Sequence, residues 1–74
     1  MPPDYKVDWQ RAALNIRAHR SLQSASKVIG EHSGLLAQFS RGEVAEPKFS
    51  QAMKILDLHT DLCGPEMTHQ LLKA

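Results

Sequence analysis

Glycine and proline divide this chain into segments that contain apolar residues, and each segment is long enough for only a few turns of helix. In the first segment Trp9, Ala12, Ala13 and Ile16 recur at helical spacing, and Asp8 before them can cap the first turn. No segment shows the alternation of apolar and polar residues that marks a half-buried strand. The sequence therefore predicts an all-α fold, a compact bundle of about five short helices.

The next two helices are delimited by the same residue types. A second helix begins after the N-cap candidate Ser21 and ends at Gly30, because glycine accepts the left-handed conformation that follows many helices. A third helix, which ends at Gly42, carries the apolar residues Leu35, Leu36 and Phe39. The short connection between these two helices predicts that they cross steeply.

A fourth helix is expected from Pro47, which suits a first turn, to about His59. Its predicted buried stripe consists of Phe49, Ala52, Met53 and Leu56. A fifth helix is expected over residues 65–73, after the break at Gly64. With 74 residues the chain is one domain at most, which we assign to residues 8–74 after a flexible N-terminal arm over residues 1–7.

A domain of this size buries only about 60% of its unfolded surface, so pairing of two copies is a natural source of extra stability. The apolar residues near the C-terminus are the predicted dimer interface: Leu62, Met67, Leu71 and Leu72. The alternative is that these residues only cover the core of their own chain. We expect a homodimer, with the interface on the C-terminal helix.

The composition argues against several classes of protein. The single cysteine, Cys63, cannot form an internal disulfide, which favours a reducing, cytoplasmic location. No apolar run approaches the ~20 residues that a membrane span needs. His59, Cys63 and His69 match no strong zinc spacing, so no metal and no cofactor are expected. No phosphate-binding glycine loop or carboxylate pair is present, and we expect no enzyme activity and no small-molecule substrate.

Charge is distributed unevenly along the chain. Residues 1–42 contain six Lys or Arg against three Asp or Glu, whereas residues 43–74 contain three against five. A surface that meets a polyanion is therefore expected in the first half.

The stretch LQSASKVIGEHSGLLAQFSRG, residues 22–42, meets the physical requirements of a helix-turn-helix. Ala25 and Ser26 are small enough for close helix contact, and Gly30 supplies the turn. Leu36 and Phe39 then bury the second helix. Its opposite face is left free, with the residues Ser33, Gly34, Ala37, Gln38 and Arg41.

On these residues the chain resembles the lambdoid phage repressor and Cro class of helix-turn-helix proteins. The resemblance extends over about residues 9–60 and includes the step Pro47-Lys48-Phe49 in the fourth-helix region. It implies a transcriptional regulator, of the kind phages and prophages encode, that dimerises on double-stranded operator DNA. It also implies base reading by Ser33, Gly34 and Gln38, and contacts to the DNA backbone by Gln23, Lys27, Arg41 and Lys48.

The chain departs from that pattern at five positions. Leu22 stands where glutamine is frequent, and Ser26 stands where alanine is common. Gly34 is expected inside the second motif helix, where it offers no side chain to a base, and Glu43 and Glu46 make the following loop acidic. Gly34, the two glutamates and the weak net charge keep a second interpretation open. The same fold could serve as a protein-interaction module, such as a phage inhibitor or an antitoxin subunit, without binding an operator.

Overall fold

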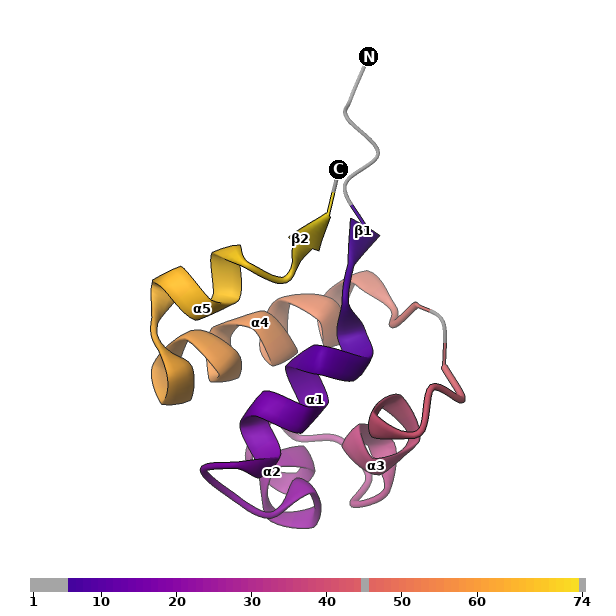
Figure 1. Ribbon diagram of the computed structural model, residues 1–74. Coiled ribbons are helices and arrows are strands. Elements are labelled where there is room, and N and C mark those ends of the chain that lie inside the picture. Colours follow the sequence, from indigo (N-terminus) through magenta and orange to yellow (C-terminus); the bar gives the residue numbers. More distant parts are fainter. Residues whose placement is uncertain (1–5, 45, 74) are drawn as a thin grey trace.

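The computed structural model describes residues 6–44 and 46–73, and five helices form a small all-α bundle, as the sequence predicts (Figure 1). The helices are α1 (Trp9–Arg17), α2 (Leu22–Val28), α3 (Leu35–Ser40), α4 (Phe49–Cys63) and α5 (Pro65–His69). Two short strands, β1 (Lys6–Val7) and β2 (Leu72–Lys73), add one antiparallel pairing. Lys6 pairs with Lys73 and Val7 with Leu72.

Helix α1 is the central element of the bundle. It packs against α2, α3 and α4, and Figure 1 shows it running between the α2–α3 pair and the α4–α5 pair. Its side chains Ala12, Ala13 and Ile16 are fully buried. Phe39 of α3 completes this core at 1% exposure, and its ring centroid lies 6.3 Å from that of Trp9. The apolar spacing that predicts α1 thus also marks its buried face.

The predicted N-caps of the first two helices are confirmed. The Asp8 carboxylate accepts a hydrogen bond from the Arg11 amide at 3.1 Å, and the Ser21 hydroxyl accepts one from the Ser24 amide at 3.2 Å. Each cap satisfies an amide that has no partner within its own helix.

The predicted buried stripe of α4 is wrong at two of its four residues, while Ala52 and Leu56 are half-buried. Phe49 is 82% exposed and Met53 is 47% exposed, whereas Ile55, Leu58 and His59 are buried. The helix also continues to Cys63 instead of ending near His59. The buried side of α4 includes His59, because both of its ring nitrogens have partners inside the fold.

The C-terminal segment also differs from the prediction. Helix α5 ends at His69, because the chain then turns into β2, and the Asp8 amide donates to the Leu71 carbonyl at 2.9 Å. Leu71 is consequently a core residue at 1% exposure, and Leu62 packs half-buried against the core. Leu71 is therefore wrong as a residue of the predicted dimer interface, whereas Met67 and Leu72 are exposed.

Two residues of the predicted N-terminal arm form a strand instead. Residues 6 and 7 form β1, because their backbone pairs with the returning C-terminal segment. Residues 1–5 of the predicted arm lie outside the described residues.

A partly buried hydrogen-bond chain, centred on the buried His59, joins α1, α4 and α5. The Asn15 amide group lies 3.1 Å from His59 Nε2, and His59 Nδ1 lies 2.7 Å from Thr68 Oγ1. The Asn15 amide nitrogen can only donate, so Nε2 must accept and Nδ1 must carry the proton. Thr68 then donates to the Gly64 carbonyl, and every member of the chain is satisfied when His59 is neutral. Burial, reinforced by the nearby charge of His19, lowers the pKa of His59 below its ordinary value.

We predict that Phe39→Ala lowers the free energy of unfolding by about 2–5 kcal/mol, because it empties a fully packed site. The same change at Phe49, which is 82% exposed, should have an effect below about 0.5 kcal/mol. Urea unfolding followed by circular dichroism measures both. Equal effects of the two substitutions would contradict the packing described for α3 and α4.

Stability should also depend on pH through His59. Its pKa is lowered in the fold, so the unfolded chain binds the extra proton more readily and acid favours unfolding. The contribution of His59 is complete above pH ~6.5 and decreases as the pH falls below that value. Thermal melts between pH 8 and pH 5, together with an NMR titration of the His59 imidazole, test this. An imidazole that titrates at or above 6.5 would disprove the assignment of a neutral His59 in this hydrogen-bond chain.

Candidate nucleic-acid interface

Helix α3 is attached to α2 through one buried hydroxyl. Gly34, the N-cap of α3, has no side chain with which to cap the helix. The Ser26 hydroxyl of α2 accepts a hydrogen bond from the Leu36 amide at 3.1 Å and donates to the Leu22 carbonyl at 2.8 Å. Ser26 and Leu36 are both fully buried. A serine on the neighbouring helix thus takes the role of the missing cap, which explains why this position is not alanine.

The two helices end in the same way. Gly30 and Gly42 adopt φ values of 75° and 73°, as expected for glycines that terminate helices. After each glycine, the amide of a glutamate donates back to a carbonyl of the helix at 3.0 Å, Glu31 to Ser26 and Glu43 to Gln38. At each helix end, this bond and the positive φ of the glycine are typical of a Schellman motif. The predicted stops at Gly30 and Gly42 are therefore confirmed.

Glu31 connects the end of α2 to the start of α4. Its carboxylate accepts hydrogen bonds from Gln51 Nε2 at 3.0 Å and from Lys54 Nζ at 3.4 Å. The Gln51 side chain in turn accepts from the Lys48 amide at 3.2 Å. The bond from Gln51, followed by Lys54, lowers the pKa of Glu31. Sequence reasoning did not identify this cluster, because its members lie up to 23 residues apart.

The predicted base-reading residues lie around the start of α3. Ser33 is exposed in the turn, and Gly34 is the half-buried N-cap, so it does not lie inside the helix. Gln38 lies one turn further on, half-buried, and its amide group makes no hydrogen bond to any described residue. Leu35, Leu36 and Phe39 face the core, which leaves Gln38 on the outer side.

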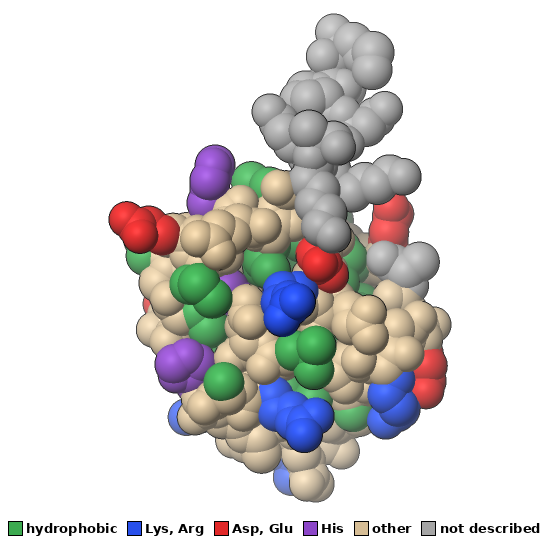
Figure 2. Space-filling view, in the orientation of Figure 1, with side chains coloured by type: hydrophobic (Ala, Val, Ile, Leu, Met, Phe, Trp, Pro, Cys, Tyr) green, Lys and Arg blue, Asp and Glu red, His purple; other side chains and the backbone are tan. Residues whose placement is uncertain are grey.

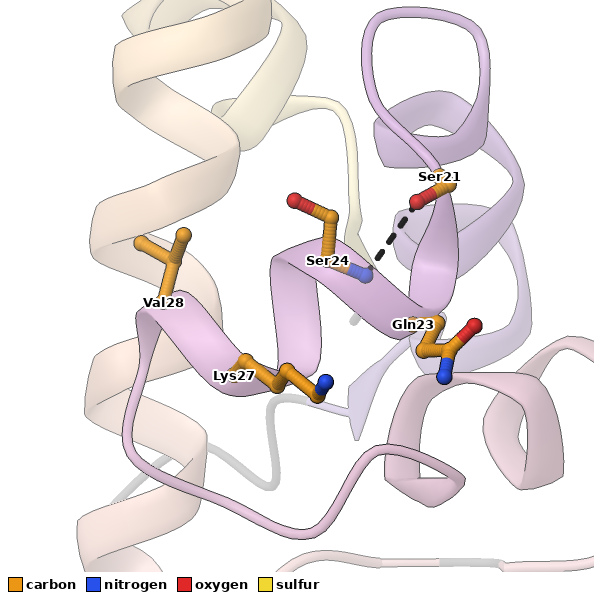
Figure 3. A pocket seen from close by; sticks show the side chains of 5 residues that line it. All are labelled: Ser21, Gln23, Ser24, Lys27 and Val28. Atoms are coloured by element: carbon orange, nitrogen blue, oxygen red, sulfur yellow. Dashed lines mark hydrogen bonds between the residues drawn. The ribbon is translucent and has the colours of Figure 1, made fainter.

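Two of the predicted DNA-backbone residues lie together on α2. Gln23 and Lys27 are exposed and contribute to the wall of a surface depression of about 540 Å³. Figure 3 shows both side chains extending to the same side of the helix, whereas Ser24 and Val28 extend to the other. A polar group of a ligand could therefore meet the Gln23 amide and the Lys27 ammonium together.

The other two residues predicted to contact the DNA backbone, Arg41 and Lys48, lie apart from this pair, and Arg41 forms an ion pair. Arg41 Nε lies 2.6 Å from a Glu43 carboxylate oxygen, and Nη2 lies 3.3 Å from the other oxygen. This exposed pair raises the pKa of Arg41 and lowers the pKa of Glu43 through the same hydrogen bond. Lys48 is exposed at the N-cap of α4. No hydrogen bond joins it to Arg41 or to the α2 pair.

A glutamine that the sequence reasoning overlooked supports the end of α3. Gln10 of α1 donates from Nε2 to the Ser40 carbonyl at 3.0 Å and lies against Gly42. No motif indicates this role, since Gln10 occupies an ordinary exposed position of α1.

Positive charge gathers on the α1–α3 side. Residues 8–42 carry five Lys or Arg and two Asp or Glu, whereas residues 49–73 carry two and three. Figure 2 shows Lys and Arg side chains over the lower part of the molecule, where Figure 1 places α1 to α3. The side of the molecule that carries the predicted reading residues is therefore also the more basic one.

Comparison with protein-family models, with curated proteins and with solved structures finds no match to this chain. Within residues 6–44 and 46–73, no helix is long and apolar enough to cross a bilayer. Over the same residues, no three His, Cys, Asp or Glu side chains lie where they could share a metal ion. The case for a function therefore depends on the α2–α3 geometry.

We predict that Ser26→Ala destabilises the protein by about 1–3 kcal/mol, since it leaves the buried Leu36 amide without a partner. Ser24→Ala is the matched control, because the Ser24 hydroxyl bonds to no described residue. Urea unfolding of both variants provides the comparison. A Ser26→Ala variant as stable as the parent would show that the hydroxyl does not hold α3.

Proposed function

We propose that this protein is a sequence-specific DNA-binding regulator that reads the major groove with the start of α3. The observation that supports it best is the attachment of α3 to α2 by Ser26, which fixes the position of α3 while Ser33 before it is exposed and Gln38 is partly exposed. A reading helix needs this combination, because its side chains must meet base edges in a fixed register.

The side chains available on this face suit DNA. Glutamine can pair with both the N6 and N7 positions of adenine, and the Gln38 amide has no competing bond within the described chain. Ser33 can bond either as donor or as acceptor. Gln23 and Lys27, side by side on α2, suit contacts to phosphate oxygens.

We further propose that the protein acts as a dimer, in the manner of a phage or prophage repressor. One domain of this size offers few base contacts, and two copies on a symmetric operator double them. The half-sites would then lie about 34 Å apart, one turn of the duplex. Sedimentation with and without operator DNA tests the stoichiometry, and a one-to-one complex would contradict it.

We predict different effects for two substitutions on this surface. Gln38→Ala should cost about 1–3 kcal/mol on the selected operator and relax the preference at one position of each half-site. Lys27→Ala should weaken binding to all sequences about equally and reduce the salt slope by roughly one unit, because a phosphate contact releases a counterion. Selection from a random DNA library, followed by titrations at several salt concentrations, measures both.

Unchanged affinity and unchanged preference in Gln38→Ala would remove Gln38 from the reading surface. If the parent protein selects no sequence at all, the DNA-binding proposal fails. The α2–α3 surface would then belong to a protein-interaction module.

The ion pair between Arg41 and Glu43 should limit non-specific binding. Glu43→Gln removes the charge that occupies the guanidinium, so Arg41 becomes available to a phosphate. We predict higher affinity for random DNA and a salt slope steeper by roughly 0.9. Glu46→Gln is the control, since Glu46 is an exposed acid of the same loop that makes no ion pair with the described residues. If both variants gain the same affinity for random DNA, the total charge matters and the Arg41–Glu43 ion pair does not.

A further inference from the structure

A second depression adjoins the first at Val28, which lines both, and extends between the end of α2 and the middle of α4. Its volume is about 310 Å³, near the lower limit of the roughly 300–1,000 Å³ typical of ligand pockets. We call it the α2–α4 groove, and its lining residues are Val28, Ile29, Lys54, Asp57, Leu58 and Asp61. Its size suits one or two side chains of a partner.

The base of the groove is apolar. Leu58 is 8% exposed and belongs to the core, and Ile29 packs half-buried against that core. Val28 remains 56% exposed, although it is an apolar residue. An apolar side chain that entered the groove would cover Val28 and gain contact with the edge of the core.

The rim of the groove is negatively charged. Asp57 and Asp61 are exposed and lie one turn apart on α4, about 6 Å along its axis. Neither carboxylate makes a hydrogen bond or ion pair with a described residue. Lys54, the one lining cation, is engaged with Glu31 at 3.4 Å. The two aspartates are thus the charges that the groove presents to a partner.

We propose that the α2–α4 groove is a docking site for a basic amphipathic helix of a partner protein. An apolar side chain of that helix enters between Val28 and Leu58, and two Lys or Arg residues four positions apart meet Asp57 and Asp61. Residues four apart lie on the same face of a helix, so this spacing matches the two aspartates. Charge complementarity selects this occupant, because the phosphates of DNA would be repelled by the same two carboxylates.

The proposal is independent of operator binding and is tested without DNA first. The probe is a synthetic helical peptide with two lysines four residues apart and one leucine between them on the same face. In one control peptide glutamates replace the lysines, and in another alanine replaces the leucine. Amide chemical shifts of the intact, isotope-labelled protein show where each peptide binds, and fluorescence anisotropy gives the Kd.

The lysine peptide should bind saturably and shift the amides of Val28, Ile29 and Leu58, and both control peptides should bind at least about tenfold more weakly. Asp57→Asn combined with Asp61→Asn should weaken the lysine peptide about tenfold, with unchanged circular dichroism. Glu66→Gln, an exposed acid on α5, is the matched control and should leave the Kd unchanged.

Several results would overturn the proposal. The first is equal binding of the lysine and glutamate peptides. The second is shifts confined to α3, which would place the peptide on the nucleic-acid face. The third is self-association in sedimentation that Val28→Lys abolishes, since it would assign the groove to a second copy of this chain.

Discussion

The hydrogen bond from the Leu36 amide to the Ser26 hydroxyl fixes the arrangement on which the rest of the α2–α3 pair depends. Helix α3 has only six residues, too few to be stable in isolation, and its N-cap is a glycine without a capping side chain. Its position is therefore determined by what it packs against and by the neighbouring serine. Because that serine also bonds to its own helix, the two helices share one buried polar site.

The sequence allowed good prediction where local chemistry is decisive. The caps at Asp8 and Ser21, and the stops at Gly30 and Gly42, depend on residues within a few positions of each other, and all four are observed. The buried face of α4 could not be predicted in this way, because apolar residues occur on several faces of this helix. Which side is buried depends on α1 and α5, and on the partners that allow His59 to be internal.

The same contrast applies to the candidate interface. The resemblance implies surface positions for Gln23, Lys27 and Ser33, and all three are exposed. Gln23 and Lys27 lie on α2, whereas Ser33 lies in the turn before α3 and not on the helix. The pairing of Arg41 with Glu43 depends on how Gly42 turns the chain, which residue types alone do not specify. The contacts of Glu31 with Gln51 and Lys54 are equally inaccessible to spacing arguments, since they join two helices across a loop.

The pairing of β1 with β2 brings the two ends of the described chain to one place, on the side of the molecule away from α2 and α3 (Figure 1). A domain or label fused to either end would therefore emerge at the same point and leave the α2–α3 surface accessible. The same proximity favours circular permutation, since a short linker could join the ends while new termini were opened in an exposed loop. The fold can thus be carried as an insert within another protein, with its candidate interface still facing outward.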